Sequence, residues 1–252
     1  MEQVILVTGG SRGIGAATAL LAAKMGYAVA VNYTANAGAA EEVVSEIVAA
    51  GGKAMAVHAD VAHETQVLAM FAKVDAGLGR LTALVNNAGI VDVTARIEDM
   101  SVARWRRMFD INVIGSMICA REAVKRMSTR HGGAGGAIVN VSSAASRIGS
   151  PGQYVDYAAS KGAVGQLTKA LSNEWVSKGV NVNAIAPGYM RTDNTAALQA
   201  DAVRSKEILS RIPAARWGEP SDMEGAIIFL SSAASDYLSG HVMTVDGGWC
   251  GR

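Results

Sequence analysis

The chain has 252 residues, half of them hydrophobic and 18% charged, and its formal net charge is +1. Such a composition can bury a large core, and the small net charge gives no electrostatic reason to expect binding to nucleic acid or to an anionic membrane. No apolar run is long enough to span a bilayer, and the first residues lack the basic start of a signal peptide. The two cysteines and four histidines follow no metal-ligand spacing, so we expect no metal site and a cytoplasmic location.

Short apolar runs alternate with longer helical patterns along the whole chain. In chain order we predict strand Gln3–Val7, helix Gly13–Met25, strand Ala28–Asn32, helix Ala37–Ala50, strand Ala54–His58, helix Glu64–Ala76, strand Leu81–Asn86, two helices within Ser101–Arg130 with a break near Ile111–Gly115, strand Gly136–Val141, helix Tyr157–Lys178, strand Val180–Ala186, a helical excursion over Asn194–Arg211, helix Ser221–Ala233 with Ser221 as its N-cap, and strand Val242–Val245.

This alternation predicts an α/β fold with a parallel sheet covered by helices on both faces. About seven strands are expected, wound in both directions as in a Rossmann fold. No segment rich in proline, serine or charge divides the chain, so we predict one nucleotide-binding domain over residues 1–252.

The segment Thr8–Gly15 is a glycine-rich turn between the first predicted strand and the first predicted helix. Gly9, Gly13 and Gly15 allow a tight turn whose backbone N–H groups can approach a pyrophosphate. The start of a helix adds partial positive charge at the same place. The sequence therefore predicts a dinucleotide site, although glycine-rich turns also occur in methyltransferases.

The end of the second predicted strand bears on which dinucleotide binds. The residues there are Asn32, Tyr33 and Thr34, and none is the carboxylate that would bind the ribose 2′-hydroxyl of NAD. Arg12 in the glycine turn could pair with the 2′-phosphate of NADP. We therefore predict NADP (NADPH) as the cofactor, with NAD as the less favoured alternative.

A tyrosine and a lysine are placed four residues apart on the long predicted helix, where their side chains share a face. These residues, Tyr157 and Lys161, follow a strand that ends in Ser142 and Ser143, at the sheet edge where ligands bind in such folds. Reduction of a carbonyl needs a proton donor, and a nearby ammonium should lower the pKa of the phenol toward neutrality.

These motifs together resemble the short-chain dehydrogenase/reductase family, over essentially the whole chain. The resemblance implies that Thr8–Gly15, with Ser11 and Ile14, binds the cofactor. It implies further cofactor contacts from Asp60, Val61, Asn86, Ala88, Gly89, Pro187, Gly188, Met190, Thr192, Tyr157 and Lys161. It also implies a catalytic tetrad of Asn112, Ser143, Tyr157 and Lys161, in which Lys161 binds the nicotinamide ribose and Asn112 supports a proton relay.

Within this family the chain is similar to 3-oxoacyl carrier-protein reductases and glucose dehydrogenases, with two departures. Ser143 precedes Tyr157 by fourteen positions where thirteen is common, and Ala144 occupies the thirteen-position spacing. Ser143 is therefore the first choice for the catalytic serine, and Ser142 is the alternative. Gln153 and Tyr154 would then face the substrate. Asn173 stands where carrier-protein reductases tend to have a basic residue, which disfavours a carrier-protein substrate without excluding it.

The resemblance further implies a substrate loop over about residues 188–212 and a homotetramer or homodimer. Candidate residues for the contact between subunits are Met117, Ile118, Val164, Leu167 and Leu171, which ordinary core packing would equally explain. The leading hypothesis is an NADP-dependent reductase of a small carbonyl compound, reversible as an alcohol dehydrogenase. The alternatives are an NAD-dependent alcohol or sugar dehydrogenase, a non-catalytic nucleotide sensor on the same fold, and, least favoured, a methyltransferase.

Overall fold

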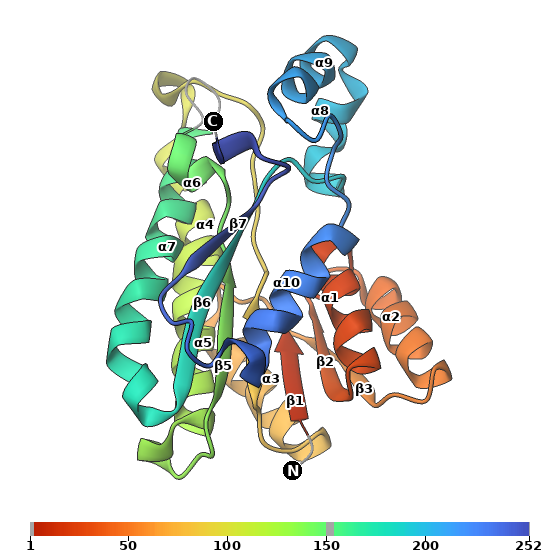
Figure 1. Cartoon of the computed structure of the whole chain (residues 1–252), viewed down its shortest axis with the longest axis vertical. Coiled ribbons are helices and arrows are strands. Elements are labelled where there is room, and N and C mark those ends of the chain that lie inside the picture. The colour runs from red at the N-terminus through yellow and green to blue at the C-terminus, as the bar shows by residue number, and fades with distance from the viewer. Residues whose placement is uncertain (1–2, 150–153, 252) are drawn as a thin grey trace.

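In the computed structural model, which describes residues 3–149 and 154–251, one parallel sheet of seven strands forms the centre of the molecule (Figure 1). The strand order is β3-β2-β1-β4-β5-β6-β7, and each neighbouring pair is parallel. The strands are β1 (Gln3–Val7), β2 (Tyr27–Tyr33), β3 (Ala54–His58), β4 (Ala83–Asn86), β5 (Gly136–Val141), β6 (Val180–Pro187) and β7 (Val242–Val245). The predicted α/β Rossmann-type sheet is thus confirmed.

Helices cover both faces of this sheet. The α-helices are α1 (Gly13–Lys24), α2 (Ala37–Ala49), α3 (Glu64–Gly77), α4 (Val102–Phe109), α5 (Ser116–Met127), α6 (Ala145–Ile148), α7 (Val155–Trp175), α8 (Ala196–Ala200), α9 (Ala202–Arg211) and α10 (Ser221–Ser231). Helices α1, α2 and α10 pack on one face, and α3, α5 and α7 pack on the other. Helices α8 and α9 stand away from the sheet, above the ends of the strands (Figure 1).

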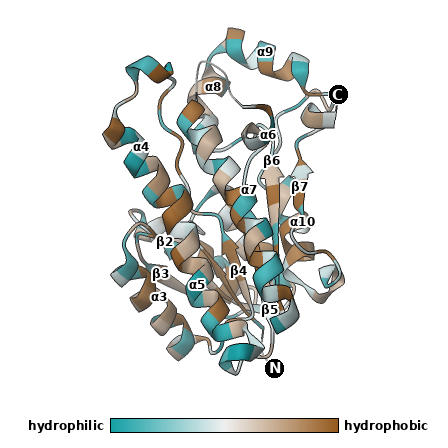
Figure 2. Cartoon of the chain, turned by 90° about the vertical axis from the view of Figure 1, so that its left-hand side faces the viewer, coloured by the Kyte–Doolittle hydropathy of each residue, from teal (hydrophilic) through white to brown (hydrophobic). Residues whose placement is uncertain are grey.

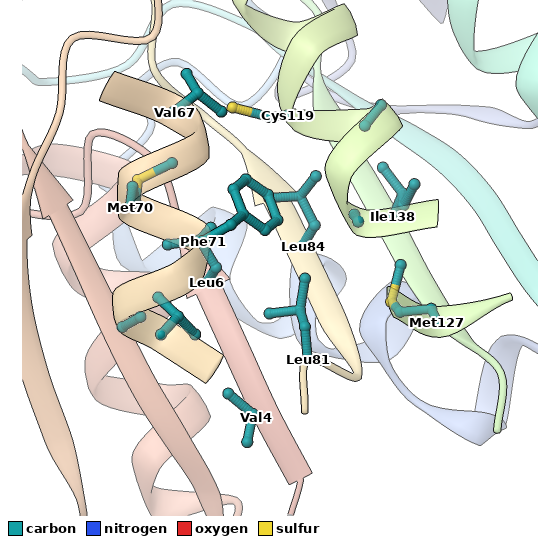
Figure 3. Close-up of a cluster of buried hydrophobic side chains, with 14 of the residues drawn as sticks. Val4, Leu6, Val67, Met70, Phe71, Leu81, Leu84, Cys119, Met127 and Ile138 are labelled. Carbon is teal, nitrogen blue, oxygen red and sulfur yellow. The ribbon is translucent and has the colours of Figure 1, made fainter. Parts of the chain in front are cut away.

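Each face of the sheet has its own apolar core. Figure 3 shows the core beneath α3 and α5, where Phe71 lies among Leu6, Leu84 and Cys119, all nearly inaccessible to solvent. The central strands β1 and β4 are buried along their length because helices cover both of their faces, and such strands are apolar at successive positions. On the peripheral helices, hydrophobic and hydrophilic residues alternate around the axis (Figure 2).

The strand order places a crevice where the cofactor motifs meet. The chain winds outward from β1 to β3 on one side and from β4 to β7 on the other. The crossovers therefore diverge between β1 and β4, and in open α/β sheets a ligand binds at that point, outside the carboxyl ends of the strands. The glycine turn follows β1, and Asn86–Gly89 begins at the end of β4.

Several element boundaries differ from the predictions. Ser221 is the first residue of α10, and Pro220 is the N-cap, so the predicted cap at Ser221 is wrong. The break predicted near Ile111–Gly115 is a π-helical segment, Asp110–Gly115, that joins α4 to α5. The excursion over Asn194–Arg211 is split into two helices at Asp201, whose side chain accepts a hydrogen bond from the Arg204 N–H and so caps α9.

Candidate active site

A cavity opens at the carboxyl ends of the central strands, and it contains about 1070 Å³ of space that is continuous with solvent. Ser143, Tyr157 and Lys161 line it, together with residues of the Asn87–Val91 and Pro187–Thr195 segments. Ile14 brings the glycine turn to the same cavity. Three motifs that are far apart in the sequence therefore meet at one sheet edge.

Asn87 and Thr8 fasten the glycine turn to the end of β4. The Asn87 amide Nδ2 donates to the carbonyl oxygens of Thr8 and Gly9, at 2.9 and 3.0 Å. The Thr8 hydroxyl accepts from the backbone N–H groups of Asn87 and Ala88, both at 3.0 Å. Sequence reasoning did not assign a site role to Asn87, although the residue stands in the motif that carries Asn86.

Asn32 fastens the other side of the turn. Its Oδ1 accepts from the Gly9 N–H at 3.1 Å, and its Nδ2 donates to the carbonyls of Val57 and Ala59. The side chain is 1% exposed, so both of its polar atoms are engaged inside the protein. Asn32, predicted as a cofactor contact, thus holds the turn in place. Thr34 is similar, because its hydroxyl donates to the carbonyl of Ala59.

The turn has the shape and the free donors that a pyrophosphate needs. A Cβ atom at Gly15 would lie 2.3 Å from the Gly9 oxygen and 2.7 Å from Asn87 Nδ2, so only glycine fits there. Gly13 has φ +54°, which also favours glycine. No side chain caps the N-terminus of α1, where Arg12 is the N-cap residue. The first N–H groups of α1 lack a side-chain partner, which suits an anionic group.

Arg12 lies at the rim of the site. Its Nη1 is 3.2 Å from an Asp193 carboxylate oxygen, and the two side chains are 70% and 72% exposed. An ion pair this exposed contributes little to stability, so the guanidinium can exchange Asp193 for another anion at small cost. The pair joins the glycine turn to the segment before α8. A Cβ at Gly13 would meet Thr192 at 3.4 Å, so the two segments are already in contact.

Asp60 and Val61, which were predicted as cofactor contacts, lie after β3. Asp60 accepts a hydrogen bond from the Ala62 N–H at 3.0 Å, and its own N–H donates to Gln66 Oε1 at 2.8 Å. Val61 is 4% exposed and lies against Gly115, where an added Cβ would come within 2.8 Å of the valine side chain. Asp60 and Val61 therefore form a fixed loop beside the π-helical segment.

Ser142 and Ser143, which sequence reasoning could not separate, face different partners. Ser143 lines the cavity together with Tyr157, and its side chain lowers the pKa of the phenol. The Ser142 hydroxyl donates to the backbone carbonyl of Lys161 at 3.0 Å, and its side chain is buried. Ser143 thus lies at the phenol, and Ser142 ties the end of β5 to α7.

Lys161 lies at the base of the cavity, beneath Tyr157. Its Nζ donates to the Val141 carbonyl at 2.7 Å and is 5.9 Å from the centre of the Tyr157 ring. Burial lowers the pKa of Lys161 to about 8. Burial also raises the pKa of Tyr157, and the Ser143 side chain offsets part of that rise. In the chain alone, burial therefore outweighs the lowering that was expected from the nearby ammonium.

Asn112 joins the loop after β4 to the helix that carries Tyr157. Its Oδ1 accepts from the Ile90 N–H at 2.8 Å, while its Nδ2 donates to the Ile90 carbonyl and to Ser160 Oγ, each at 3.0 Å. The Ser160 hydroxyl in turn donates to the Tyr157 carbonyl at 2.8 Å. A Cβ at Gly89 would lie within 3.3 Å of both Asn112 Oδ1 and Lys161 Nζ, so these groups adjoin.

Asn86 points away from the cavity. Its Nδ2 donates to the Ser116 carbonyl and to Asn140 Oδ1, within the protein interior. Asn140 Nδ2 continues this chain of hydrogen bonds to the hydroxyl of Thr168, on α7. Asn86 was predicted as a cofactor contact, and the structure places its side chain among groups that join β4, β5 and α7.

A buried ion pair beside Tyr157 was not predicted. Arg104 on α4 binds Asp156 on α7 through two nitrogens, at 2.6 and 3.2 Å, and its Nη1 donates to the Val93 carbonyl at 2.7 Å. The side chains are 10% and 0% exposed. Asp156 also accepts from the Tyr157 N–H at 2.9 Å. The pair therefore fixes the first turn of α7 and the wall of the cavity together.

Arg104→Ala is expected to lower the free energy of unfolding by about 3–5 kcal/mol, because it leaves the Asp156 carboxylate buried without its partner. Arg96→Ala is the matched control: it removes an arginine from the exposed pair with Glu98, and should cost at most about 1 kcal/mol. Urea unfolding of both variants measures the difference. Equal losses would contradict a special role for the buried pair.

Lys161 is expected to make the chain more stable as the pH rises from about 8 toward 10.5, since burial lowers its folded-state pKa below its ordinary value. Between these values the unfolded chain keeps a proton that the folded chain has released, so raising the pH favours the folded state. Urea unfolding at several pH values, for the wild type and for Lys161→Met, isolates this contribution. If the free energy of unfolding of the wild type does not rise relative to that of Lys161→Met above pH 8, the lowered pKa is contradicted.

Comparison with known proteins gives the family. The sequence pattern of the enoyl-(acyl carrier protein) reductase family matches residues 9–250. The chain belongs to the short-chain dehydrogenase/reductase family. It is 49% identical to the oxidoreductase YgfF of Escherichia coli K12 over 245 residues, which cover 97% of this chain and 99% of that protein. It is 42% identical to a 3-oxoacyl-[acyl-carrier-protein] reductase of Synechocystis, over 98% of this chain and 96% of the relative.

A solved member of the family has the same fold. The gluconate 5-dehydrogenase from Burkholderia cenocepacia, in complex with NADP and tartrate, superposes with a TM-score of 0.93 at 35% identity. The superposition covers 100% of this chain and 97% of that one. Among the described residues of our short-chain dehydrogenase/reductase, no helix is both long and apolar enough to cross a membrane. The same residues hold no group of three or more histidine, cysteine or acidic side chains that could bind a metal ion.

Proposed function

We propose that the protein transfers a hydride between NADP(H) and a carbonyl compound or the corresponding secondary alcohol. The observation that carries this proposal is that Ser143, Tyr157 and Lys161 line one cavity, with the Lys161 Nζ 5.9 Å from the centre of the Tyr157 ring and the Ser143 side chain lowering the pKa of the phenol. A hydroxyl pair in this cavity can hold a carbonyl oxygen and deliver a proton to it. The membership of an oxidoreductase family agrees with this chemistry.

Each residue of the site has a proposed part. Tyr157 gives the proton to the carbonyl oxygen, or takes it from the alcohol, and Ser143 holds that oxygen against the phenol. Lys161 stabilises the phenolate that remains and binds the ribose beside the nicotinamide. Asn112 joins the loop after β4 to α7 through its side-chain amide, and in this proposal it supports the proton relay by holding these segments in place. The nicotinamide, when bound, supplies or accepts the hydride.

The remaining cofactor residues surround the same crevice. The first turn of α1 would bind the pyrophosphate, Asp60 and Val61 the adenine side, and Pro187–Thr192 the nicotinamide side. Asn32 and Asn86 act indirectly in this proposal, because their side-chain amides are used inside the protein. A segment over about residues 188–212, which includes α8 and α9, forms the substrate loop.

NADP is the proposed cofactor because the end of β2 offers no carboxylate and Arg12 extends, exposed, from the glycine turn. Two relatives support this choice through the NADP in their solved structures. Arg12→Ala is expected to weaken NADPH binding by about tenfold and to leave NADH binding nearly unchanged, since an exposed charge-assisted contact to the 2′-phosphate is lost. Calorimetric titration of both cofactors measures this.

Arg96→Ala controls for the loss of an exposed arginine, because the Arg96 side chain is also 70% exposed and pairs with an acid. It should bind both cofactors as the wild type does. Equal binding of NADPH and NADH by the wild type would instead favour the alternative, an NAD-dependent alcohol or sugar dehydrogenase. A protein that binds the dinucleotide but turns over no carbonyl or alcohol would favour the nucleotide sensor.

A homotetramer or homodimer, in the cytoplasm, completes the proposal. Of the residues predicted for the contact between subunits, Met117 is 49% exposed and Ile114 beside it is 45% exposed. Val164 is 1% exposed and belongs to the interior of the subunit, while Ile118 and Leu171 are partly buried and pack against the core. Light scattering of the purified protein gives the number of subunits.

A further inference from the structure

Six of the residues that line the cavity have apolar or aromatic side chains, and we call this group the apolar wall. They are Ile90, Val91, Ile148, Tyr189, Leu198 and Trp249. They come from four separate segments: the loop after β4, α6, the loop that leads to α8 and α9, and the C-terminal turn. A substrate held at Ser143 would place its remaining atoms against these groups.

Three aromatic rings give this wall its rigidity. The rings of Tyr189 and Trp249 lie 4.7 Å apart at an angle of 36°, and Trp217 meets Tyr189 edge-on at 5.7 Å. Trp249 is 7% exposed, and Ile208 and Ile212 pack against the same group. Large rings held in this way offer extensive apolar contact without the entropy cost of ordering long side chains.

Among the described residues that line the cavity, Lys161 is the one with a charged side chain, and its Nζ donates to the Val141 carbonyl. Gln153, which was also expected to face the substrate, lies outside the described residues. Arg211 lies 4.7 Å from the centre of the Trp249 ring and is not among the lining residues. A carboxylate against the apolar wall would therefore lose water without gaining a cation.

Two of the hydroxyl groups that line the cavity, those of Thr195 and Tyr154, have hydrogen-bond partners in the protein. The Thr195 hydroxyl donates to the Met190 carbonyl and accepts from Gln199 Nε2 at 2.9 Å. The Tyr154 hydroxyl accepts from the Thr94 hydroxyl at 2.8 Å. A substrate hydroxyl that bonds to Thr195 would need to displace the bonds that Thr195 already makes.

We infer that the substrate is a neutral ketone with an apolar or aromatic substituent, and that a carboxylate far from the reacting carbonyl is disfavoured. The inference rests on the proposed function, because it takes Ser143 and Tyr157 as the position of the carbonyl. It separates this protein from relatives whose names specify an acidic sugar, such as the gluconate 5-dehydrogenase.

A matched pair of compounds tests the inference. Methyl 4-oxo-4-phenylbutanoate and its free acid share the ketone and the ring, and the charge of the acid is two methylenes away from the carbonyl. With NADPH, kcat/KM for the ester is expected to exceed that for the acid by at least about tenfold, because the carboxylate is buried unpaired. Equal values, or a preference for the acid, would overturn the inference.

Two variants of the substrate loop show whether the wall itself discriminates. Leu198→Arg puts a cation on the wall and is expected to raise the acid-to-ester ratio of kcat/KM by about tenfold. Val203 on α9 is 72% exposed and does not line the cavity. Val203→Arg therefore adds the same charge away from the cavity and should leave the ratio unchanged. An equal change in both variants would mean that general electrostatic attraction, rather than the wall, sets the preference, and would overturn the inference.

The two proposals fail in distinguishable ways. If 5-ketogluconate is reduced and both phenyl ketones are not, the proposed function stands and the inference fails. If no ketone is reduced and no alcohol is oxidised with either cofactor, the proposed function fails, and the inference fails with it.

Discussion

Tyr157→Phe is expected to lower kcat for ketone reduction by about 10²–10⁴-fold, because a positioned proton donor contributes that much to such a step. The affinity for NADPH, measured by calorimetric titration, should be nearly unchanged, because the phenyl ring remains in place. The structure supports the choice of this residue because Tyr157 lines the cavity with Ser143, and its ring centre is 5.9 Å from the Lys161 Nζ.

Tyr154→Phe is the matched control. It removes a hydroxyl from the same cavity, where the Tyr154 group is bonded to Thr94 rather than to Ser143. This variant should keep most of kcat and change mainly KM. If Tyr157→Phe kept wild-type turnover, or if Tyr154→Phe lost as much, the assignment of the proton donor would be wrong.

Gly15→Ala is expected to have the second large effect, on cofactor binding. The new Cβ would lie 2.3 Å from the Gly9 oxygen, a contact with backbone that cannot be relieved by rotating a side chain. The turn must move, so we expect NADPH affinity to fall by at least about tenfold and the free energy of unfolding by about 1–3 kcal/mol. Titration and urea unfolding measure the two quantities.

Gly225→Ala tests whether the loss is local. Gly225 lies on the exposed side of α10, where nothing lies within 4 Å of an added Cβ. Because alanine favours the helix more than glycine does, this variant should be neutral or more stable by up to about 1 kcal/mol. Normal NADPH binding by Gly15→Ala would show that the turn does not cradle the cofactor as proposed.

The fold could be predicted from the sequence because its signals are local. Buried parallel strands are short apolar runs, and Gly26 and Gly51 mark the ends of α1 and α2 with positive φ. The break between α4 and α5 was also visible. The cap of α10 was not, because Pro220 and Ser221 are both acceptable near a helix start and only the backbone angles distinguish them.

The site was predictable as a set of motifs and less so as a set of contacts. Adjacent residues at a strand end point in opposite directions, so a motif with Asn86 and Asn87 does not show which side chain reaches the turn. The structure gives that contact to Asn87. Similarly, the sequence shows that position 32 is an asparagine and not a carboxylate, but it does not show that Asn32 accepts a hydrogen bond from the Gly9 N–H.

Two features depend on three-dimensional burial and left no local signal. Arg104 and Asp156 are 52 residues apart, and each alone looks like an ordinary charge near a helix start. The direction of the Tyr157 pKa depends on how much water the fold removes, which spacing to Lys161 does not reveal. An Arg and an Asp on adjoining helices, one of them next to the proposed proton donor, would be the pattern to look for.

Deuterium transfer from NADPH doubly deuterated at the nicotinamide C4 tests the central claim most directly. The purified protein is given this cofactor and a ketone that it reduces, and the alcohol is analysed by mass spectrometry. The account predicts one deuterium on the carbinol carbon of the product, and at least about 100-fold slower formation of labelled alcohol with Tyr157→Phe. Alcohol that forms without deuterium at that carbon would contradict hydride transfer at this site.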